Sequence, residues 1–174
     1  MNNQIIKNFF TLEEVNKIEH YINTKVKTSP MFYLQPELGR QYASIAERFM
    51  VDCIGGFPQD ILDKLTNFTE TFFGVSNLQI FDIIMIRYSN EFGLIPHLPE
   101  HKDNGVIKKY TIDYQHNGNI DWPLLIDGKE YLLENNDIVT FLGSNQMHGR
   151  PDRIFKDKEY LENIFFQFIE KREK

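Results

Sequence analysis

From residue 78 onward the chain is built from short segments rich in Ile, Val, Phe and Tyr, which are separated by turn residues. These segments are LQIFDIIMIRY, VIKKYTIDYQ, WPLLI, KEYLL, DIVTFLG and YLENIFFQFIE. Their lengths and compositions are typical of β-strands. Asp127-Gly128 lies between two apolar runs and predicts a two-residue hairpin, and Asn117-Gly118 indicates another turn. The pattern predicts about seven or eight antiparallel strands and argues against a parallel α/β fold.

Two helical stretches precede the strands. The first, residues 11–24, begins with Thr11 three positions before Glu14, which is a capping-box pattern, and continues with apolar residues at helical spacing. The second follows Pro58, where apolar residues recur at three- and four-residue steps as far as Gly74. Both patterns predict helices that bury one face.

Helices followed by strands predict an α+β protein that is mainly β. We expect a sandwich or double-stranded β-helix (jelly roll) in residues 78–170, with the helices of residues 1–77 packed on its sheet. Residues 25–57 show no clear period, so we expect loops there with one short strand. The length of 174 residues fits a single domain, residues 1–174.

Composition narrows the range of functions. The formal charge of −6 provides no broad basic field for phosphate backbones, so nucleic-acid binding is disfavoured. Cys53 is the only cysteine, which excludes an internal disulfide and suits a reducing compartment. The first residues lack the pattern of a secretion signal, and no apolar run reaches membrane-spanning length. We therefore expect a cytoplasmic protein with no membrane association.

Three residues could form a metal site. In an extended segment, alternating side chains would place His101 and Asp103 on the same side, where they could share a cation. His148 lies 45 residues beyond Asp103, a separation that suits a strand returning across a jelly roll. Two histidines and one carboxylate leave three octahedral positions open, as in oxygen-activating iron(II) sites.

The other histidines offer fewer indications of ligation. His97 would share the side of the ligand pair in a straight strand, but Pro96 and Pro99 argue against such a strand. We expect His97 at the pocket rim or on the surface. His20 falls on the first predicted helix and His116 beside a predicted turn, so a surface role is expected for both.

The chain resembles the iron(II)/2-oxoglutarate dioxygenase superfamily, and within it the prolyl-4-hydroxylase-like branch. The resemblance covers residues 79–169 through IRYSNEFGLIPHLPEHKDN, KKYTIDYQHNG, LENNDIVTFLGSNQMHGR and KEYLENIFFQF, whereas the preceding residues match nothing specific. It implies that His101, Asp103 and His148 bind Fe(II). It also implies that the protein uses 2-oxoglutarate and O2 to hydroxylate a C–H bond, with release of succinate and CO2.

The resemblance also predicts residues for the co-substrate. In the family, a Lys or Arg about ten residues beyond the distal histidine holds the far carboxylate of 2-oxoglutarate, and that position here is Lys158. Arg150 is the second candidate, because it shares the face of His148 if that strand stays extended. The same segment offers two further cations, Arg153 and Lys156.

Two tyrosines and two loop regions complete the predicted site. Tyr88 resembles the family tyrosine that hydrogen-bonds the keto acid, and Tyr110 is a weaker match. Residues 25–57 and 89–100 are expected around the barrel mouth, where substrate is chosen. A peptidyl prolyl or other protein residue ranks first and a small metabolite second. An alkylated nucleic-acid base ranks last, because YLENIFFQFIE lacks the paired arginines of the base-repair branch.

Two alternatives remain at this stage. A cupin-like metalloenzyme on the same fold would not use 2-oxoglutarate and would need His97 as a further ligand. A non-catalytic jelly-roll module that binds a sugar or a protein would carry these histidines incidentally. Dependence on metal and keto acid separates the three readings.

Overall fold

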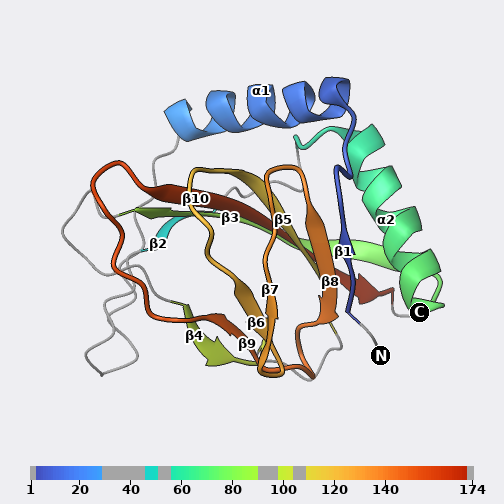
Figure 1. Ribbon diagram of the computed structural model, residues 1–174. Helices are drawn as coiled ribbons and strands as arrows, with labels where there is room; N and C mark the ends of the chain where they lie inside the picture. The colour runs from blue at the N-terminus through green and yellow to red at the C-terminus, as the bar shows by residue number, and fades with distance from the viewer. Residues whose placement is uncertain (1–2, 29–45, 51–55, 90–97, 104–108, 172–174) are drawn as a thin grey trace.

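The computed structural model describes residues 3–28, 46–50, 56–89, 98–103 and 109–171 (Figure 1). Within them, two antiparallel sheets face each other, a large sheet in the order β1-β8-β5-β10-β3-β2 and a small one in the order β4-β9-β6-β7. The large sheet consists of β1 (Ile5–Ile6), β8 (Ile138–Leu142), β5 (Tyr110–Gly118), β10 (Tyr160–Glu170), β3 (Leu78–Ser89) and β2 (Ala46–Met50). The small sheet consists of β4 (Leu98–His101), β9 (His148–Arg150), β6 (Leu124–Ile126) and β7 (Lys129–Tyr131). The predicted mainly β, double-sheet fold is confirmed.

Both predicted helices are present, α1 (Leu12–Thr28) and α2 (Gln59–Phe73). The capping box forms at the start of α1, where the Thr11 N–H donates to Glu14 Oε2 at 2.7 Å and the Glu14 N–H donates to Thr11 Oγ1 at 3.3 Å. At the end of α2, Gly74 adopts a left-handed φ of 65° that glycine adopts without strain. Local sequence therefore sets the beginning of one helix and the end of the other, and α1 runs beyond the predicted stretch.

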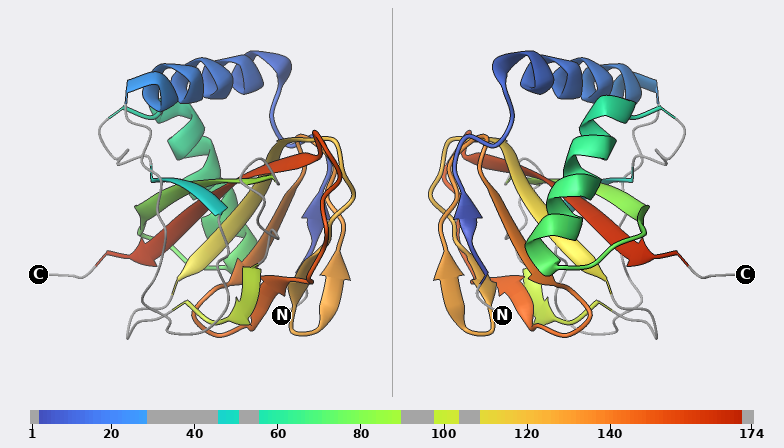
Figure 2. Two further views of the ribbon diagram at one scale, coloured as in Figure 1. Left: turned by 90° about the vertical axis from the view of Figure 1, so that its left-hand side faces the viewer. Right: turned by 90° about the vertical axis from the view of Figure 1, so that its right-hand side faces the viewer.

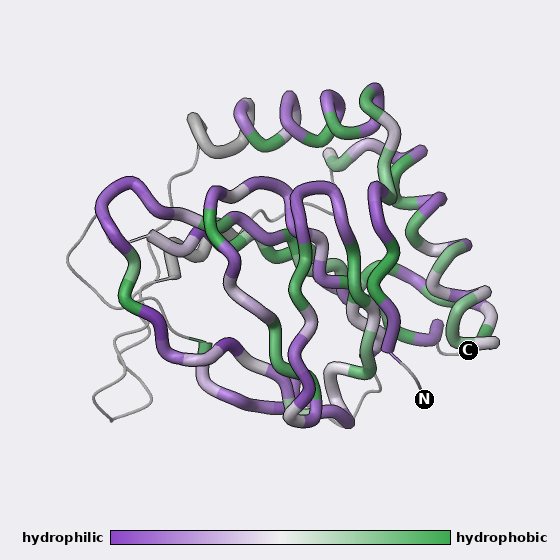
Figure 3. Tube along the Cα trace, in the orientation of Figure 1, coloured by the Kyte–Doolittle hydropathy of each residue, from purple (hydrophilic) through white to green (hydrophobic). Residues whose placement is uncertain are grey.

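The two helices cover one face of the large sheet (Figures 1 and 2). Along α1, hydrophilic segments alternate with hydrophobic ones, as expected of a helix that buries one side (Figure 3). The layer between helices and sheet is a continuous apolar core that includes Ile18, Ile61, Leu65, Ile112 and Phe166, all fully buried. Each such side chain contributes about 1.5–3 kcal/mol through burial. This core anchors the sheet that carries one wall of the site.

β5 is buried on both of its faces. Tyr110, Ile112 and Tyr114 belong to the core under the helices. The alternating residues Thr111 and Asp113 point between the two sheets, where they contact residues of the small-sheet side. The space inside the double sheet is therefore partly polar, and this is where a site can form.

The turns differ in how well they were predicted. The hairpin at Asp127-Gly128 joins β6 to β7 and is confirmed, with φ of 50° and 74°, as a tight two-residue turn requires. The turn predicted at Asn117-Gly118 is wrong, because β5 continues through both residues. Gly118 pairs with Leu161 of β10 instead.

The N-terminal part contributes strands as well as helices. β2 is the single short strand expected in residues 25–57, and the remainder of that region from residue 29, including Cys53, lies outside the described residues apart from 56–57. β1 was not predicted; Ile5 pairs with Val139 of β8 and extends the large sheet. No described helix is long and apolar enough to cross a membrane.

Candidate metal centre

The three predicted ligands come together at one end of the small sheet. β4 and β9 pair antiparallel, and His101 stands directly opposite His148 in their register. Asp103 follows β4 by two residues, and its backbone N–H donates to the Gly143 carbonyl at 2.9 Å. One ligand atom from each side chain lies within 4.8 Å of the others. The strand pairing thus joins two histidines that are 47 positions apart.

Backbone carbonyls orient both imidazoles. Nδ1 of His101 lies 2.8 Å from the carbonyl oxygen of Pro99, and Nδ1 of His148 lies 3.0 Å from that of Gln146. Because a carbonyl only accepts, each Nδ1 must carry the proton, which leaves Nε2 as the metal-binding nitrogen. The Nε2 of His148 points at Asp103, 3.8 Å from its Oδ1.

The Asp103 carboxylate is held through its other oxygen. Gln167 of β10 donates to Asp103 Oδ2 at 3.1 Å, and the Thr111 hydroxyl lies 3.5 Å from the same atom. Gly143 packs against this carboxylate so closely that a Cβ there would lie 2.0 Å from Oδ2. Oδ1 is thereby turned toward His148.

His148 is suited to ligation by its environment. Its side chain is almost fully buried, and burial lowers the pKa of its imidazole below the usual 6.5. A lowered pKa keeps the ring neutral at neutral pH, which is the form that binds a metal. The donor set of two neutral imidazole nitrogens and one carboxylate oxygen fits iron(II).

Arg150 lies inside the double sheet, two residues beyond His148 on the same face of β9. It is 1% exposed, its Nη2 lies 3.3 Å from Asp113 Oδ2, and its Nη1 donates to the Trp122 carbonyl. Its guanidinium is 5.9 Å from the centre of the Tyr88 ring. Tyr88 is fully buried on this inner side of β3, so it and Arg150 are neighbours, as both predicted roles require.

Asp113 gives this interior an unusual charge arrangement. Its other oxygen, Oδ1, accepts from Asn163 Nδ2 at 2.6 Å. Burial raises the pKa of the Asp113 carboxyl, and the positive charge of Arg150 opposes that rise. Among the described residues, Arg150 Nε and Asn163 Oδ1 have no hydrogen-bond partner although both are buried. Unpaired buried groups are costly, and a polar ligand that bonds to them would remove this cost.

Lys158, the first choice for the co-substrate, is placed elsewhere. It is exposed on the turn before β10, with φ of 64°, and its carbonyl accepts from Asn119. Gln167, which contacts Asp103, follows Lys158 by nine residues, most of which belong to the extended strand β10. At about 3.3 Å per residue, the backbones of Lys158 and Gln167 are up to about 30 Å apart. The other two cations also turn outward: Arg153 donates to the Asp121 carbonyl, and Lys156 is exposed. Lys158 is thus exposed on a turn, whereas Arg150 is buried inside the double sheet.

Two further predictions need correction and one lies outside the described residues. Tyr110 faces the helices, where its hydroxyl donates to Glu170 at 2.5 Å, so it is a core residue rather than a site residue. His116 is 9% exposed and not a surface residue, because α1 covers it. His20 is exposed, as predicted, and His97 lies outside the described residues.

Four site residues were missed by sequence reasoning: Thr111, Asp113, Asn163 and Gln167. All are polar residues at alternate positions within strands that are otherwise rich in apolar residues. Such a pattern is normally read as a solvated face. In a double sheet the same pattern can also line the interior between the sheets. Polar residues that alternate with apolar ones within a strand are therefore the signal that could have identified these four residues.

No family model and no curated protein matches the sequence. Solved structures do match. The viral collagen prolyl hydroxylase of Paramecium bursaria Chlorella virus-1, in its 2-oxoglutarate complex, is 13% identical with a TM-score of 0.62, and the match covers 98% of this chain and 97% of that one. EctD from S. alaskensis with bound Fe is 12% identical with a TM-score of 0.69, covering 97% of this chain and 72% of that one.

A third similar structure is SnoN of nogalamycin biosynthesis, a non-haem α-ketoglutarate-dependent epimerase. It is 8% identical with a TM-score of 0.74, and the match covers 97% of this chain and 78% of that one. These likenesses establish the fold, since identity is low throughout. The chain thus shares its fold with a collagen prolyl hydroxylase bound to 2-oxoglutarate, with an α-ketoglutarate-dependent epimerase and with an iron-bound protein.

Proposed function

We propose that this protein is an iron(II)- and 2-oxoglutarate-dependent oxygenase that hydroxylates a C–H bond. The observation that carries the proposal is the convergence of His101, Asp103 and His148, with both Nε2 atoms available, in a fold that iron-binding oxygenases share. The preferred substrate is a prolyl or other residue of a protein, through the likeness to the collagen prolyl hydroxylase, and a small molecule comes second.

The metal would be held by His101 Nε2, His148 Nε2 and Asp103 Oδ1. When bound, iron(II) together with 2-oxoglutarate and O2 supplies the oxidation of a C–H bond to an alcohol, with release of succinate and CO2. Gln167 and the Pro99 and Gln146 carbonyls fix the three side chains, so that little reorganisation accompanies binding. These contacts are the protein's contribution to the geometry.

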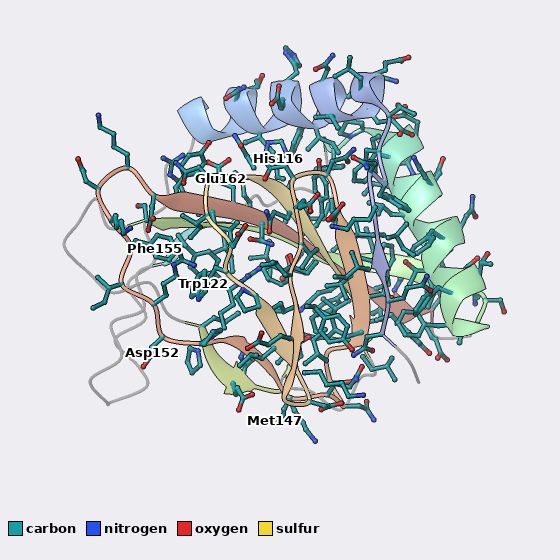
Figure 4. The ribbon with its side chains drawn as sticks, in the orientation of Figure 1. His116, Trp122, Met147, Asp152, Phe155 and Glu162 are labelled. Carbon is teal, nitrogen blue, oxygen red and sulfur yellow. The ribbon has the colours of Figure 1, made fainter. Side chains whose placement is uncertain are left out.

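Arg150 is the residue proposed to hold the far carboxylate of 2-oxoglutarate. It shares the inner face of β9 with His148, so a co-substrate that reaches the metal extends along this face toward the guanidinium. Its unpaired Nε–H is a donor for a carboxylate, and the bond would be charge-assisted. Trp122 and Phe155, with ring centroids 5.2 Å apart, lie side by side (Figure 4) and help to keep water from this interior.

The test follows the weak visible charge-transfer band that forms when 2-oxoglutarate is added to the iron(II) protein without oxygen. We expect a band in the wild-type protein and none in His148→Ala. Arg150→Gln should bind iron as the wild-type protein does, but its affinity for 2-oxoglutarate should be lower by about tenfold or more. Lys158→Gln is the matched control and should behave as wild type.

Absence of the band in wild type, together with calorimetry that finds no iron-dependent binding of 2-oxoglutarate, would refute the proposal. A Lys158→Gln variant as impaired as Arg150→Gln would refute the assignment of Arg150 alone. A positive result justifies a substrate screen that begins with proline-containing peptides and measures succinate release.

A further inference from the structure

The hairpin that joins β6 to β7 lies beside the segment that leads into His148. β6 pairs antiparallel with β9, and Ile126 at the end of β6 stands opposite His148 in the register. In Figure 4, Met147, which precedes His148, lies at the end of the molecule where β6 and β7 meet in Figure 1. The turn residue Asp127 is therefore close to the metal centre, although it is not one of the three ligands.

The carboxylate of Asp127 bonds to this segment through both of its oxygens. Oδ1 accepts from the Met147 N–H at 3.0 Å, and Oδ2 accepts from the side-chain amide of Gln146 at 2.9 Å. The backbone adds a third bond, because the Asp127 N–H donates to the Met147 carbonyl at 2.8 Å. Hydrogen bonds to an ionised carboxylate are stronger than those to a neutral acceptor. Asp127 thus ties the hairpin to the two residues that precede His148.

Gln146 connects these bonds to the metal ligand. Its backbone carbonyl oxygen lies 3.0 Å from Nδ1 of His148 and holds the proton there, which leaves Nε2 for the metal. Its side-chain oxygen accepts from the Leu142 N–H at 2.9 Å, at the end of β8. The Gln146 amide has one orientation that suits both neighbours, because a carboxylate accepts and a backbone N–H donates. Gln146 is therefore held at both ends of its side chain.

The turn that contains Gln146 also contacts the carboxylate ligand. The Gln146 N–H donates to the Leu142 carbonyl at 2.8 Å and closes the turn. The residue after Leu142 is Gly143, whose carbonyl accepts from the Asp103 N–H at 2.9 Å. One end of this turn thus holds Asp103, and the other end holds His148. A displacement of Gln146 would disturb both ligands.

The hairpin turn by itself does not require a carboxylate. Asp127 has a φ of 50° and Gly128 has a φ of 74°, and asparagine adopts this left-handed conformation as readily as aspartate does. An asparagine side chain, however, has one oxygen and one N–H donor group, so it would leave one of the two donors without an acceptor. The carboxylate is therefore matched to the segment before His148 and not to the turn.

We propose that Asp127 is a positioning residue for the metal centre, which acts on His148 through Gln146. The inference rests on the proposed function, because it concerns the metal that this site would hold. The two carboxylate bonds fix residues 146–147, and the Gln146 carbonyl then fixes the imidazole ring. Nε2 of His148 is thereby kept pointing at Asp103 Oδ1, 3.8 Å away.

The variant Asp127→Asn tests this role, because it keeps a residue suited to the turn and removes one carboxylate bond. We expect its affinity for iron(II), measured by anaerobic calorimetry, to fall by about tenfold or more, as loss of an outer partner of a metal ligand does. Glu130→Gln removes an exposed carboxylate from the same hairpin and is the matched control, which should bind iron(II) as wild type does.

Gly128→Ala separates positioning from the stability of the hairpin. A Cβ at Gly128 would meet nothing within 4 Å, so the alanine strains the left-handed backbone and leaves the bonds of Asp127 in place. This variant should unfold at a lower urea concentration than wild type and keep its affinity for iron(II).

The second readout follows His148 in the metal-free protein. Nitrogen NMR of the labelled protein distinguishes the two tautomers of a neutral imidazole, and the His148 signals are assigned from their absence in His148→Ala. Wild type should carry the proton on Nδ1, because the Gln146 carbonyl accepts it. Asp127→Asn should show a mixture of both tautomers, whereas Gly128→Ala and Glu130→Gln should resemble wild type.

Three results would each overturn the positioning role. They are an iron(II) affinity of Asp127→Asn within twofold of wild type, a single Nδ1–H tautomer of His148 in that variant, and an equal loss of affinity in Gly128→Ala. Failure of the proposed function has a different signature, because the wild-type protein itself would then bind no iron(II). The tautomer comparison in the metal-free protein would still decide whether Asp127 positions His148.

Discussion

The replacement Gly143→Ala tests whether the Asp103 carboxylate is positioned as a metal ligand. A Cβ at this glycine would lie 2.0 Å from Asp103 Oδ2 and 2.6 Å from Thr111 Oγ1, whereas real Cβ contacts are essentially never below 3.0 Å. The carboxylate must therefore retreat by about 1 Å, unless the backbone of Gly143 moves instead. Metal sites tolerate deviations of only about 0.2 Å in ligand distance.

A displacement of this size should weaken iron(II) binding by about 10–100-fold, as loss of a residue that orients a metal ligand does. Crowding at the site should also lower the free energy of unfolding by about 1–3 kcal/mol. Anaerobic calorimetry measures the affinity for iron(II), and urea unfolding of the metal-free protein measures the stability. The two effects are thus separated.

Gly118→Ala is the matched control. Its Cβ would lie 2.7 Å from Leu161 Cδ1 and 3.3 Å from the Tyr160 carbonyl oxygen, which is similar crowding without a metal ligand. We expect it to lose stability and to keep its affinity for iron(II). If Gly143→Ala is folded and binds iron(II) within twofold of wild type, the argument that Gly143 positions Asp103 as a ligand is refuted.

Three further predictions concern buried groups. Asp113→Asn leaves Arg150 as an unpaired buried charge, so the free energy of unfolding of the metal-free protein, measured with urea, should fall by about 3–5 kcal/mol. Addition of 2-oxoglutarate and iron(II) should stabilise this variant more than it stabilises the wild-type protein. Equal stabilisation of the two proteins would contradict the role of Arg150. Phe166→Ala removes a fully buried ring and should cost about 3–5 kcal/mol in the same assay, and a loss under about 1 kcal/mol would contradict its place in the core. Burial lowers the pKa values of His116 and His148 below 6.5, so the unfolded state binds protons before the folded state does as the pH falls. The free energy of unfolding should therefore fall below pH 6.5, by at most about 1.4 kcal/mol per pH unit for each histidine. His116→Gln should reduce the slope of the free energy of unfolding against pH.

β5 shows how far alternation alone can be interpreted. Residues 110–115 read YTIDYQ, and the strict alternation of apolar and polar residues correctly predicts a strand. The same alternation suggests one buried and one solvated face. In the structure the face with Thr111 and Asp113 is also buried, because the second sheet closes over it. Whether a polar face meets solvent or a partner sheet depends on strands far away in the chain.

The metal centre, too, was predictable from local sequence only in part. The spacing of His101 and Asp103 makes them neighbours in almost any extended conformation, so sequence alone could nominate them. Their meeting with His148 required antiparallel pairing of β4 and β9. Which cation lies inside the double sheet was harder still to predict, since Lys158 has the spacing that the resemblance implies but is exposed on a turn with a left-handed backbone.

Sequence by itself determined the features that depend on near neighbours: the capping box of α1, the glycine that ends α2, the Asp127-Gly128 hairpin and the strands β3, β5, β6, β7, β8 and β10. Each follows from backbone conformation and hydrogen bonding within a few residues. The tertiary structure alone decided that Arg150 rather than Lys158 lies inside the double sheet, and that His116 is buried beneath α1. The physical reason is that burial and charge pairing are set by surfaces contributed by distant segments, which local sequence does not encode.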